Sequence, residues 1–103
     1  EDDVERMRMA YLKHRNYMHQ SFMEMGLECR APQGAFYAFP NIEKTGMTSH
    51  QFAMELLEAQ NVAVVPGSAF GASGEGYIRC SFAMGFENIK EACARMKVFM
   101  ADR

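Results

Sequence analysis

Apolar residues recur along the first part of the chain at the spacing of an amphipathic helix. Between residues 1 and 25 they stand three, four or seven positions apart and form one stripe: Val4, Met7, Tyr11, Met18, Phe22 and Met25. Gly26 follows the stripe, and glycine is the usual left-handed residue at the end of a helix. The pattern predicts a long helix over residues 1–25 that ends at Gly26.

Two more segments, residues 48–60 and 87–101, have helical periodicity. The first begins with TSHQ, which fits a capping box: the Thr48 hydroxyl accepts a hydrogen bond from the Gln51 amide, and the Gln51 side chain accepts one from the Thr48 amide. The apolar face of this helix is formed by Phe52, Ala53, Leu56 and Leu57. The stripe of the last helix consists of Ile89, Ala92, Cys93, Met96, Phe99 and Met100.

Three shorter segments have the composition of β-strands. GAFYAFPNI (residues 34–42) is apolar on both faces and rich in aromatic residues, so it predicts a buried strand that stops at Pro40 and Asn41. VAVV (62–65) is apolar throughout, which predicts a strand buried on both sides. In YIRCSFAM (77–84), alternation directs one set of side chains toward the core: Ile78, Cys80, Phe82 and Met84.

The predicted elements follow the order α-β-α-β-β-α. A chain of 103 residues can build one hydrophobic core and not two. Amphipathic helices bury their apolar stripes most economically against a small sheet. We therefore expect a single α+β domain in which helices cover a three-stranded sheet.

Composition excludes several classes of function. The net charge is −2 and the 11 lysines and arginines are scattered, which gives no surface for nucleic acid. No apolar stretch approaches the ~20 residues of a membrane span, and the first ten residues are charged, unlike a signal peptide. Cys29, Cys80 and Cys93 lack a C-x-x-C spacing, which favours reduced thiols. We expect a cytoplasmic protein that does not bind membranes.

Methionine is unusually frequent, with ten residues. A methionine-rich surface can form a flexible groove for a partner, but methionines at helical spacing more often fill a core. The helical spacing favours the core here.

Arg79 is the candidate for chemistry. It stands on the third predicted strand, on the face opposite the core residues, with Tyr77, Ser81 and Ala83. A strand arginine on this face can simply meet water. In a cleft, its planar fork could instead hold a carboxylate through two charge-assisted hydrogen bonds. The pattern alone leaves both interpretations open.

Other sites are less well supported by the sequence. The glycine-rich segment GSAFGASGEG (67–76) lacks the G-K-[ST] ending of a phosphate loop, and a strand rather than a helix follows it. His14, His19 and His50 are dispersed, so they predict neither a metal site nor a Cys-His couple. No catalytic or metal-binding residue is expected in the chain.

Three segments, taken together, resemble a known family: GAFYAFPNI, FAMELLEAQNVAVVPGSAFGASGEGYIRCSFA and ENIKEACARM. They look like the C-terminal small domain of class I/II pyridoxal-phosphate-dependent aminotransferases, the aspartate aminotransferase family of fold type I. The resemblance covers nearly the whole chain and is closest from VAVVPGSAFG to GEGYIRCSFA. It implies that residues 1–103 are one domain of a longer, homodimeric enzyme.

The resemblance also implies a role for Arg79, because the matching arginine of the family binds the α-carboxylate of the amino acid substrate. The reaction implied is transfer of an amino group between an amino acid and a 2-oxo acid. Pyridoxal 5′-phosphate and its lysine would belong to a large domain that precedes residue 1 and packs on this one. The chain's own lysines do not match the family's lysine motif: Lys13, Lys44, Lys90 and Lys97. The fragment alone should be inactive and bind no cofactor.

Two alternatives stay open. The chain could be a free-standing α/β module that binds amino acids on the Arg79 face without reacting them. It could also be an interaction domain whose exposed apolar surface drives self-association.

Overall fold

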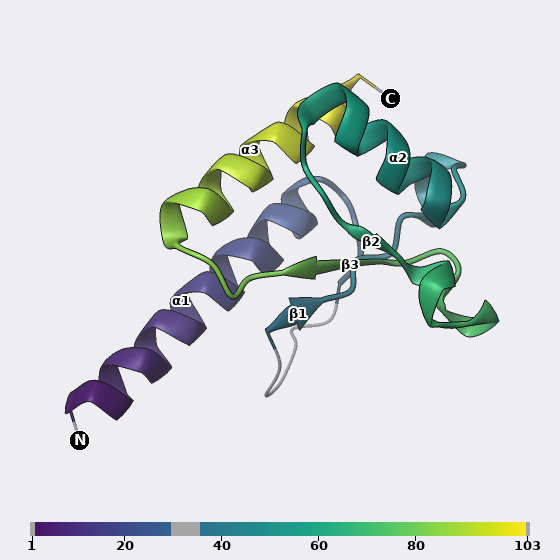
Figure 1. Ribbon diagram of the computed structural model, residues 1–103. Helices are drawn as coiled ribbons and strands as arrows, with labels where there is room; N and C mark the ends of the chain where they lie inside the picture. Colours follow the sequence, from purple (N-terminus) through teal and green to yellow (C-terminus); the bar gives the residue numbers. More distant parts are fainter. Residues whose placement is uncertain (1, 30–35, 103) are drawn as a thin grey trace.

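The computed structural model describes residues 2–29 and 36–102, which form three helices and a three-stranded sheet (Figure 1). The helices are α1 (Asp2–Glu24), α2 (Ser49–Gln60) and α3 (Phe86–Ala101). The strands are β1 (Tyr37–Ala38), β2 (Val65–Pro66) and β3 (Ile78–Ser81). Short 3₁₀ turns are η1 (Glu43–Thr45), η2 (Gly67–Phe70) and η3 (Ala72–Gly74). The predicted order and the α+β class are confirmed.

The helix ends follow the local signals in the sequence. Gly26 has a φ of +81°, and the amides of Gly26 and Leu27 donate to the carbonyls of Met23 and Phe22, which is a Schellman motif. At α2, both hydrogen bonds of the predicted capping box between Thr48 and Gln51 are formed. Both predicted boundaries are therefore confirmed.

The sheet has the order β1-β3-β2, and both pairs are antiparallel. The strands are shorter than predicted. Of the strand predicted at 34–42, residues 34 and 35 lie outside the described part, the ladder covers only Tyr37–Ala38, and Asn41 forms a separate bridge with Tyr77.

The strand predicted at 62–65 is wrong except for its last residue. Asn61 takes the left-handed conformation that ends α2, and residues 62–64 then cross from that helix to the sheet, where pairing begins at Val65. Val62 is buried but Ala63 is exposed, so this segment is not buried on both sides.

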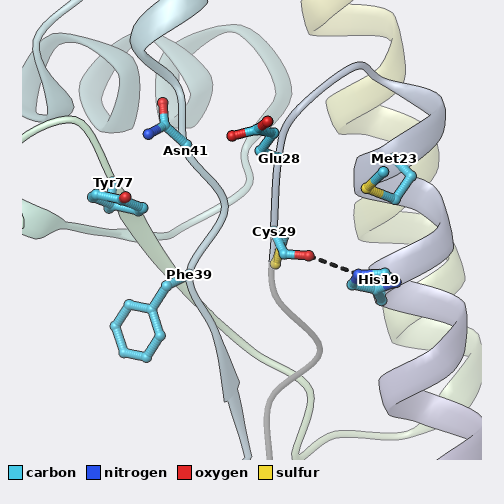
Figure 2. Close-up of a pocket in the computed structure, with 7 residues that line it drawn as sticks. All are labelled: His19, Met23, Glu28, Cys29, Phe39, Asn41 and Tyr77. Carbon is cyan, nitrogen blue, oxygen red and sulfur yellow. Dashed lines mark hydrogen bonds between the residues drawn. The ribbon is translucent and has the colours of Figure 1, made fainter.

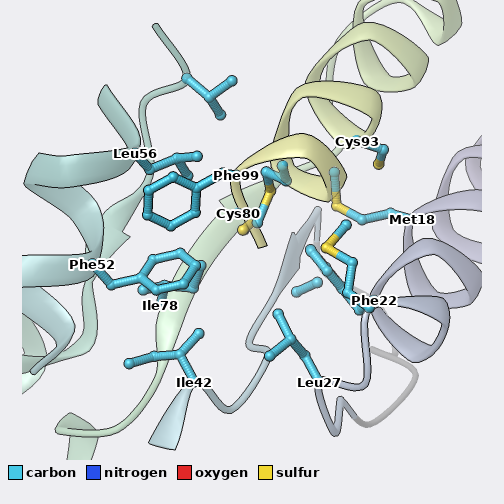
Figure 3. Packing of buried hydrophobic residues seen from close by; sticks show 14 of the residues in the cluster. Met18, Phe22, Leu27, Ile42, Phe52, Leu56, Ile78, Cys80, Cys93 and Phe99 are labelled. Carbon is cyan, nitrogen blue, oxygen red and sulfur yellow. The ribbon is translucent and has the colours of Figure 1, made fainter. Parts of the chain in front are cut away.

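The core lies between one face of the sheet and the three helices (Figure 3). On β3, Ile78 and Cys80 point into it, and Phe82 follows them just beyond the strand. Phe52 of α2 and Phe99 of α3 meet edge to face, with centroids 5.3 Å apart. From α1 the cluster takes Met18 and Phe22. Most of the predicted core face is confirmed, but Met84 and Leu57 are exposed.

The other face of the sheet is uncovered within the described chain. The aromatic side chains of Tyr37, Phe39 and Tyr77 are exposed there. The prediction of a buried strand is therefore wrong for most of its described start, since Phe36, Tyr37 and Phe39 are exposed and only Ala38 between them is buried. These side chains stay exposed because all three helices contribute to the cluster on the opposite face of the sheet.

The first half of α1 extends beyond the core (Figure 1). Val4 and Met7 are 67% and 72% exposed, so the predicted stripe packs only in its second half. The assignment of methionines to the core is accordingly only partly correct. Met18, Met25 and Met96 are buried, but five are exposed: Met7, Met9, Met23, Met54 and Met84. No helix among the described residues is long and apolar enough to cross a bilayer.

Glu75 fastens the loop between β2 and β3 to the start of α2. Its carboxylate accepts hydrogen bonds from the backbone amide and the hydroxyl of Ser49, at 2.8 and 3.0 Å. Ser49 is fully buried, and its hydroxyl oxygen also accepts from the amide of Ser68. The hydrogen bonds from the Ser49 amide and hydroxyl lower the pKa of Glu75.

Glu75→Gln should remove an acid-sensitive part of the stability. Because the folded pKa of Glu75 lies below its ordinary value of 4.5, its contribution is fully present above that value and is lost as the pH falls through the folded pKa. Urea unfolding at a series of pH values should therefore give a shallower loss toward acid pH in Glu75→Gln than in the unchanged chain. The matched control is Glu58→Gln, at an exposed glutamate of α2. Equal slopes for the unchanged chain and both variants would contradict this role.

Candidate functional site

Arg79 occupies the central strand of the sheet. It pairs with Val65 of β2, and its strand neighbours Ile78 and Cys80 point into the core. Alternation therefore directs Arg79 to the uncovered face, where it is half-buried. The predicted placement opposite the core is confirmed.

Two aromatic rings hold the guanidinium. Its Cζ atom lies 4.2 Å from the ring centroid of Tyr37 and 4.8 Å from that of Phe70. Tyr37 stands opposite Ser81 in the β1–β3 ladder, so it is the diagonal neighbour of Arg79 on the same face. Among residues 2–29 and 36–102, no carboxylate forms a salt bridge with Arg79. Its charge is thus held without a counter-ion from this part of the chain.

The loop that carries Phe70 is closed by backbone contacts. The amide of Gly67 donates to the carbonyl of Tyr77 at 2.8 Å, and the amide of Tyr77 donates to the carbonyl of Gly74 at 3.2 Å. Gly67 and Gly74 approach so closely that a Cβ on either would overlap the carbonyl oxygen of the other. This close approach makes the segment a tight connection and explains why glycine is needed at both positions.

An open cleft of about 770 Å³ lies between α1 and the segment after β1 (Figure 2). Phe39 and Tyr77 border it on the sheet side and His19 on the helix side. Its other lining residues are Met23, Glu28, Cys29 and Asn41.

In the cleft, His19 contacts the backbone of Cys29. A ring nitrogen of His19 lies 2.6 Å from the backbone carbonyl of Cys29, so this nitrogen donates to the carbonyl. Burial raises the pKa of the Cys29 thiol, as it does for Cys80 and Cys93, which disfavours the reactive thiolate.

The other two histidines, His14 and His50, do not line the cleft. His14 stacks on Phe86 at the start of α3, and His50 lies exposed in α2. No group of three or more metal-ligating side chains occurs within the part of the chain that the structure describes.

The contacts of Tyr37 and Phe70 with Arg79 could not be predicted from the sequence. Tyr37 is five residues from the end of its predicted strand, and only the β1–β3 register puts it on the Arg79 face. Phe70 lies in the glycine-rich segment, where no periodicity tells which way a side chain points. The one available signal was the aromatic composition: Tyr37 lies in an aromatic-rich strand segment, and Phe70 lies in the loop that precedes the arginine strand.

The chain is similar to known aminotransferases over nearly its whole length. The sequence profile described as "Aminotransferase class I and II" matches residues 1–96. The chain is 57% identical to the Bacillus subtilis protein YugH, which is named as an aminotransferase, over 96% of this chain and 26% of that protein. It is 46% identical to the aspartate aminotransferase of Pyrococcus abyssi, over 97% of this chain and 26% of that enzyme.

Solved structures have the same fold. The aromatic aminotransferase of Pyrococcus horikoshii OT3 superimposes with a TM-score of 0.94 at 46% identity, covering 99% of this chain and 27% of that one. The chain therefore spans about a quarter of the length of the relatives it matches.

Gly74→Ala should open the loop that carries Phe70. The added Cβ would overlap the Gly67 carbonyl, and a backbone shift of this kind costs about 1–3 kcal/mol. We expect a loss of this size in the free energy of unfolding, measured by urea denaturation. Gly85→Ala is the control, because a Cβ there meets only the Asn88 side-chain nitrogen, at 3.8 Å. An equal loss in the two variants would show that the close approach is unimportant.

Proposed function

Since the chain belongs to the family of class I and II aminotransferases, we propose that residues 1–103 are the C-terminal small domain of a pyridoxal-phosphate-dependent aminotransferase. The enzyme would transfer an amino group between an amino acid and a 2-oxo acid. Its other working parts would lie in the roughly three quarters of the relatives' length that this chain does not span, consistent with the 26% coverage of YugH.

Arg79 is the residue of this domain that would bind the α-carboxylate of the substrate. The observation that supports this most directly is a half-buried guanidinium on an uncovered sheet face, with no carboxylate partner among the described residues. A guanidinium presents a planar fork that matches both oxygens of a carboxylate. Each hydrogen bond to a charged group contributes about 1.5–3 kcal/mol, so a bidentate pair is enough to orient a small ligand.

The proposed work of Arg79 is orientation. The central strand is hydrogen-bonded on both sides, so it offers a rigid base for the side chain. When two hydrogen bonds hold the carboxylate, they fix the direction of its bond to Cα and thereby the position of the Cα proton. This chain would supply the two hydrogen bonds, and the group that takes the proton would come from the large domain.

We propose that none of the four lysines of the chain attaches pyridoxal 5′-phosphate, since each already has a partner in the fold. Lys97 pairs with Glu24 at 2.5 Å, and Lys44 donates to the carbonyl of Met25 at 3.1 Å. Lys13 and Lys90 both lie over the ring of Phe86. We assign the cofactor, which provides the electron sink of the reaction, to the large domain.

The large domain of the same chain is the partner proposed for the uncovered sheet face. Exposed aromatic rings surround Arg79 there, and the exposed first half of α1 offers Val4, Met7 and Met9. We further propose a homodimeric, cytoplasmic parent enzyme. The resemblance supports the dimer, and the free thiols Cys29, Cys80 and Cys93 are typical of a reducing compartment.

In the full-length enzyme, Arg79→Lys should lower kcat/KM for the amino acid about 10- to 100-fold, because lysine keeps the charge but loses one of the two parallel hydrogen bonds. Attachment of the cofactor, followed by its absorbance, should be unchanged. Arg95→Lys on α3, where the arginine pairs with Glu91, is the matched control and should retain its kinetics. Unchanged kinetics in Arg79→Lys would remove Arg79 from the substrate site.

The 103-residue chain alone should not bind pyridoxal phosphate covalently at one defined lysine. After incubation with the cofactor and reduction with borohydride, peptide mapping by mass spectrometry should find only low, scattered labelling of Lys13, Lys44, Lys90 and Lys97. Stoichiometric labelling of a single lysine would mean that the attachment site lies in this chain.

A further inference from the structure

The two rings that contact Arg79 come from the segments on either side of its strand. Tyr37 belongs to the edge strand β1, and Phe70 ends the turn η2 that follows β2. Both rings lie within the ~6 Å at which an aromatic face attracts a cation, at 4.2 and 4.8 Å. The guanidinium is therefore held by two segments that are independent of each other in sequence.

We propose that Tyr37 and Phe70 are positioning residues, which fix the guanidinium of Arg79 in the orientation that receives the substrate carboxylate. This inference rests on the proposed function, in which Arg79 binds that carboxylate. Neither ring needs to contact the substrate, because each acts through the arginine.

The chemistry of the contact suits this role. A cation–π contact engages the positive charge through the face of a ring and uses none of the five N–H donors of the guanidinium. A salt bridge to a protein carboxylate would occupy those donors, and none is formed within the described ranges. The rings can thus order the side chain in the absence of ligand and leave its hydrogen-bonding fork available.

Ordering the arginine in advance should strengthen binding. A long side chain that is free to rotate loses conformational entropy when a ligand fixes it, and this loss weakens the affinity. If the rings have already fixed the side chain, the carboxylate meets an arginine with little freedom left to lose.

The rings are themselves held by the fold. Phe70 meets Phe39 edge to face, with centroids 6.5 Å apart and an interplanar angle of 80°. Its loop is tied to α2 through the hydrogen bond from the Ser68 amide to Ser49. Tyr37 is fixed by its pairing with Ser81 on β3. These contacts allow the rings to act as a support rather than as mobile surface groups.

The experiment uses the full-length enzyme with its cofactor and two ring-removing variants, Tyr37→Leu and Phe70→Leu. Tyr37→Phe keeps the ring and tests for rescue. Phe86→Leu is the matched control, since the Phe86 ring also makes cation–π contacts, but with Lys13 and Lys90 and not with Arg79. Circular dichroism and cofactor absorbance verify that each variant is folded and loaded.

The amino donor is chosen as the standard amino acid that changes the cofactor absorbance fastest in the unchanged enzyme. The binding probe is the des-amino acid of that donor, which keeps the carboxylate and the side chain but cannot react. Its Kd is measured by calorimetry, and KM and kcat are measured for the donor itself.

We expect Tyr37→Leu and Phe70→Leu each to weaken binding of the probe about 3- to 10-fold and to raise KM more than they lower kcat. Tyr37→Phe and Phe86→Leu should stay within about twofold of the unchanged enzyme. An unchanged Kd in both ring-removing variants would overturn the inference. So would an equal effect of Phe86→Leu, which would indicate a general consequence of removing a ring, or an equal effect of Tyr37→Phe, which would indicate the hydroxyl.

Arg79→Lys in the same binding assay separates this inference from the proposed function. If Arg79→Lys leaves the Kd of the probe unchanged, Arg79 does not bind the carboxylate and both proposals fail. If Arg79→Lys weakens binding but the ring-removing variants do not, Arg79 keeps its role and only the positioning role of the rings is lost.

Discussion

The alternation of side chains along β3 determines the arrangement of this domain. The strand lies between two others, so its backbone is fixed, and its residues must point alternately to the two faces of the sheet. Ile78 and Cys80 point to the face on which the three helices pack, and this face holds the core. Arg79, between them, has to point to the other face, where no helix of the described chain covers it. The strand β3 thus carries core residues on one face and Arg79, the candidate functional residue, on the other.

The uncovered face is costly for a chain in water, because it exposes aromatic surface that would be more stable if buried. Phe39 and Phe70 are 48% and 50% exposed there. The loop that carries Phe70 is nevertheless stabilised in one conformation. The close approach of Gly67 and Gly74 and the Glu75–Ser49 hydrogen bonds both contribute to this. Such support for an exposed ring is expected if this sheet face, which includes Arg79, contacts another part of the enzyme.

Helix boundaries and core stripes could be predicted because their signals are local. The capping box at Thr48, the glycine at position 26 and the apolar spacing in residues 87–101 all act within a few residues of the feature they determine. The strands were less predictable, since VAVV is apolar enough for a strand, but the crossing from α2 to the sheet uses most of it. The position of Arg79 followed from alternation. Its two ring contacts did not, because they depend on the β1–β3 register and on a closed loop.

A structure of the full-length enzyme with the unreactive des-amino acid bound would test the central claim most directly. The account predicts that both carboxylate oxygens lie at hydrogen-bond distance, about 2.7–3.2 Å, from two guanidinium nitrogens of Arg79. A carboxylate held elsewhere, or Arg79 paired with a carboxylate of the protein itself while the ligand is bound, would contradict it.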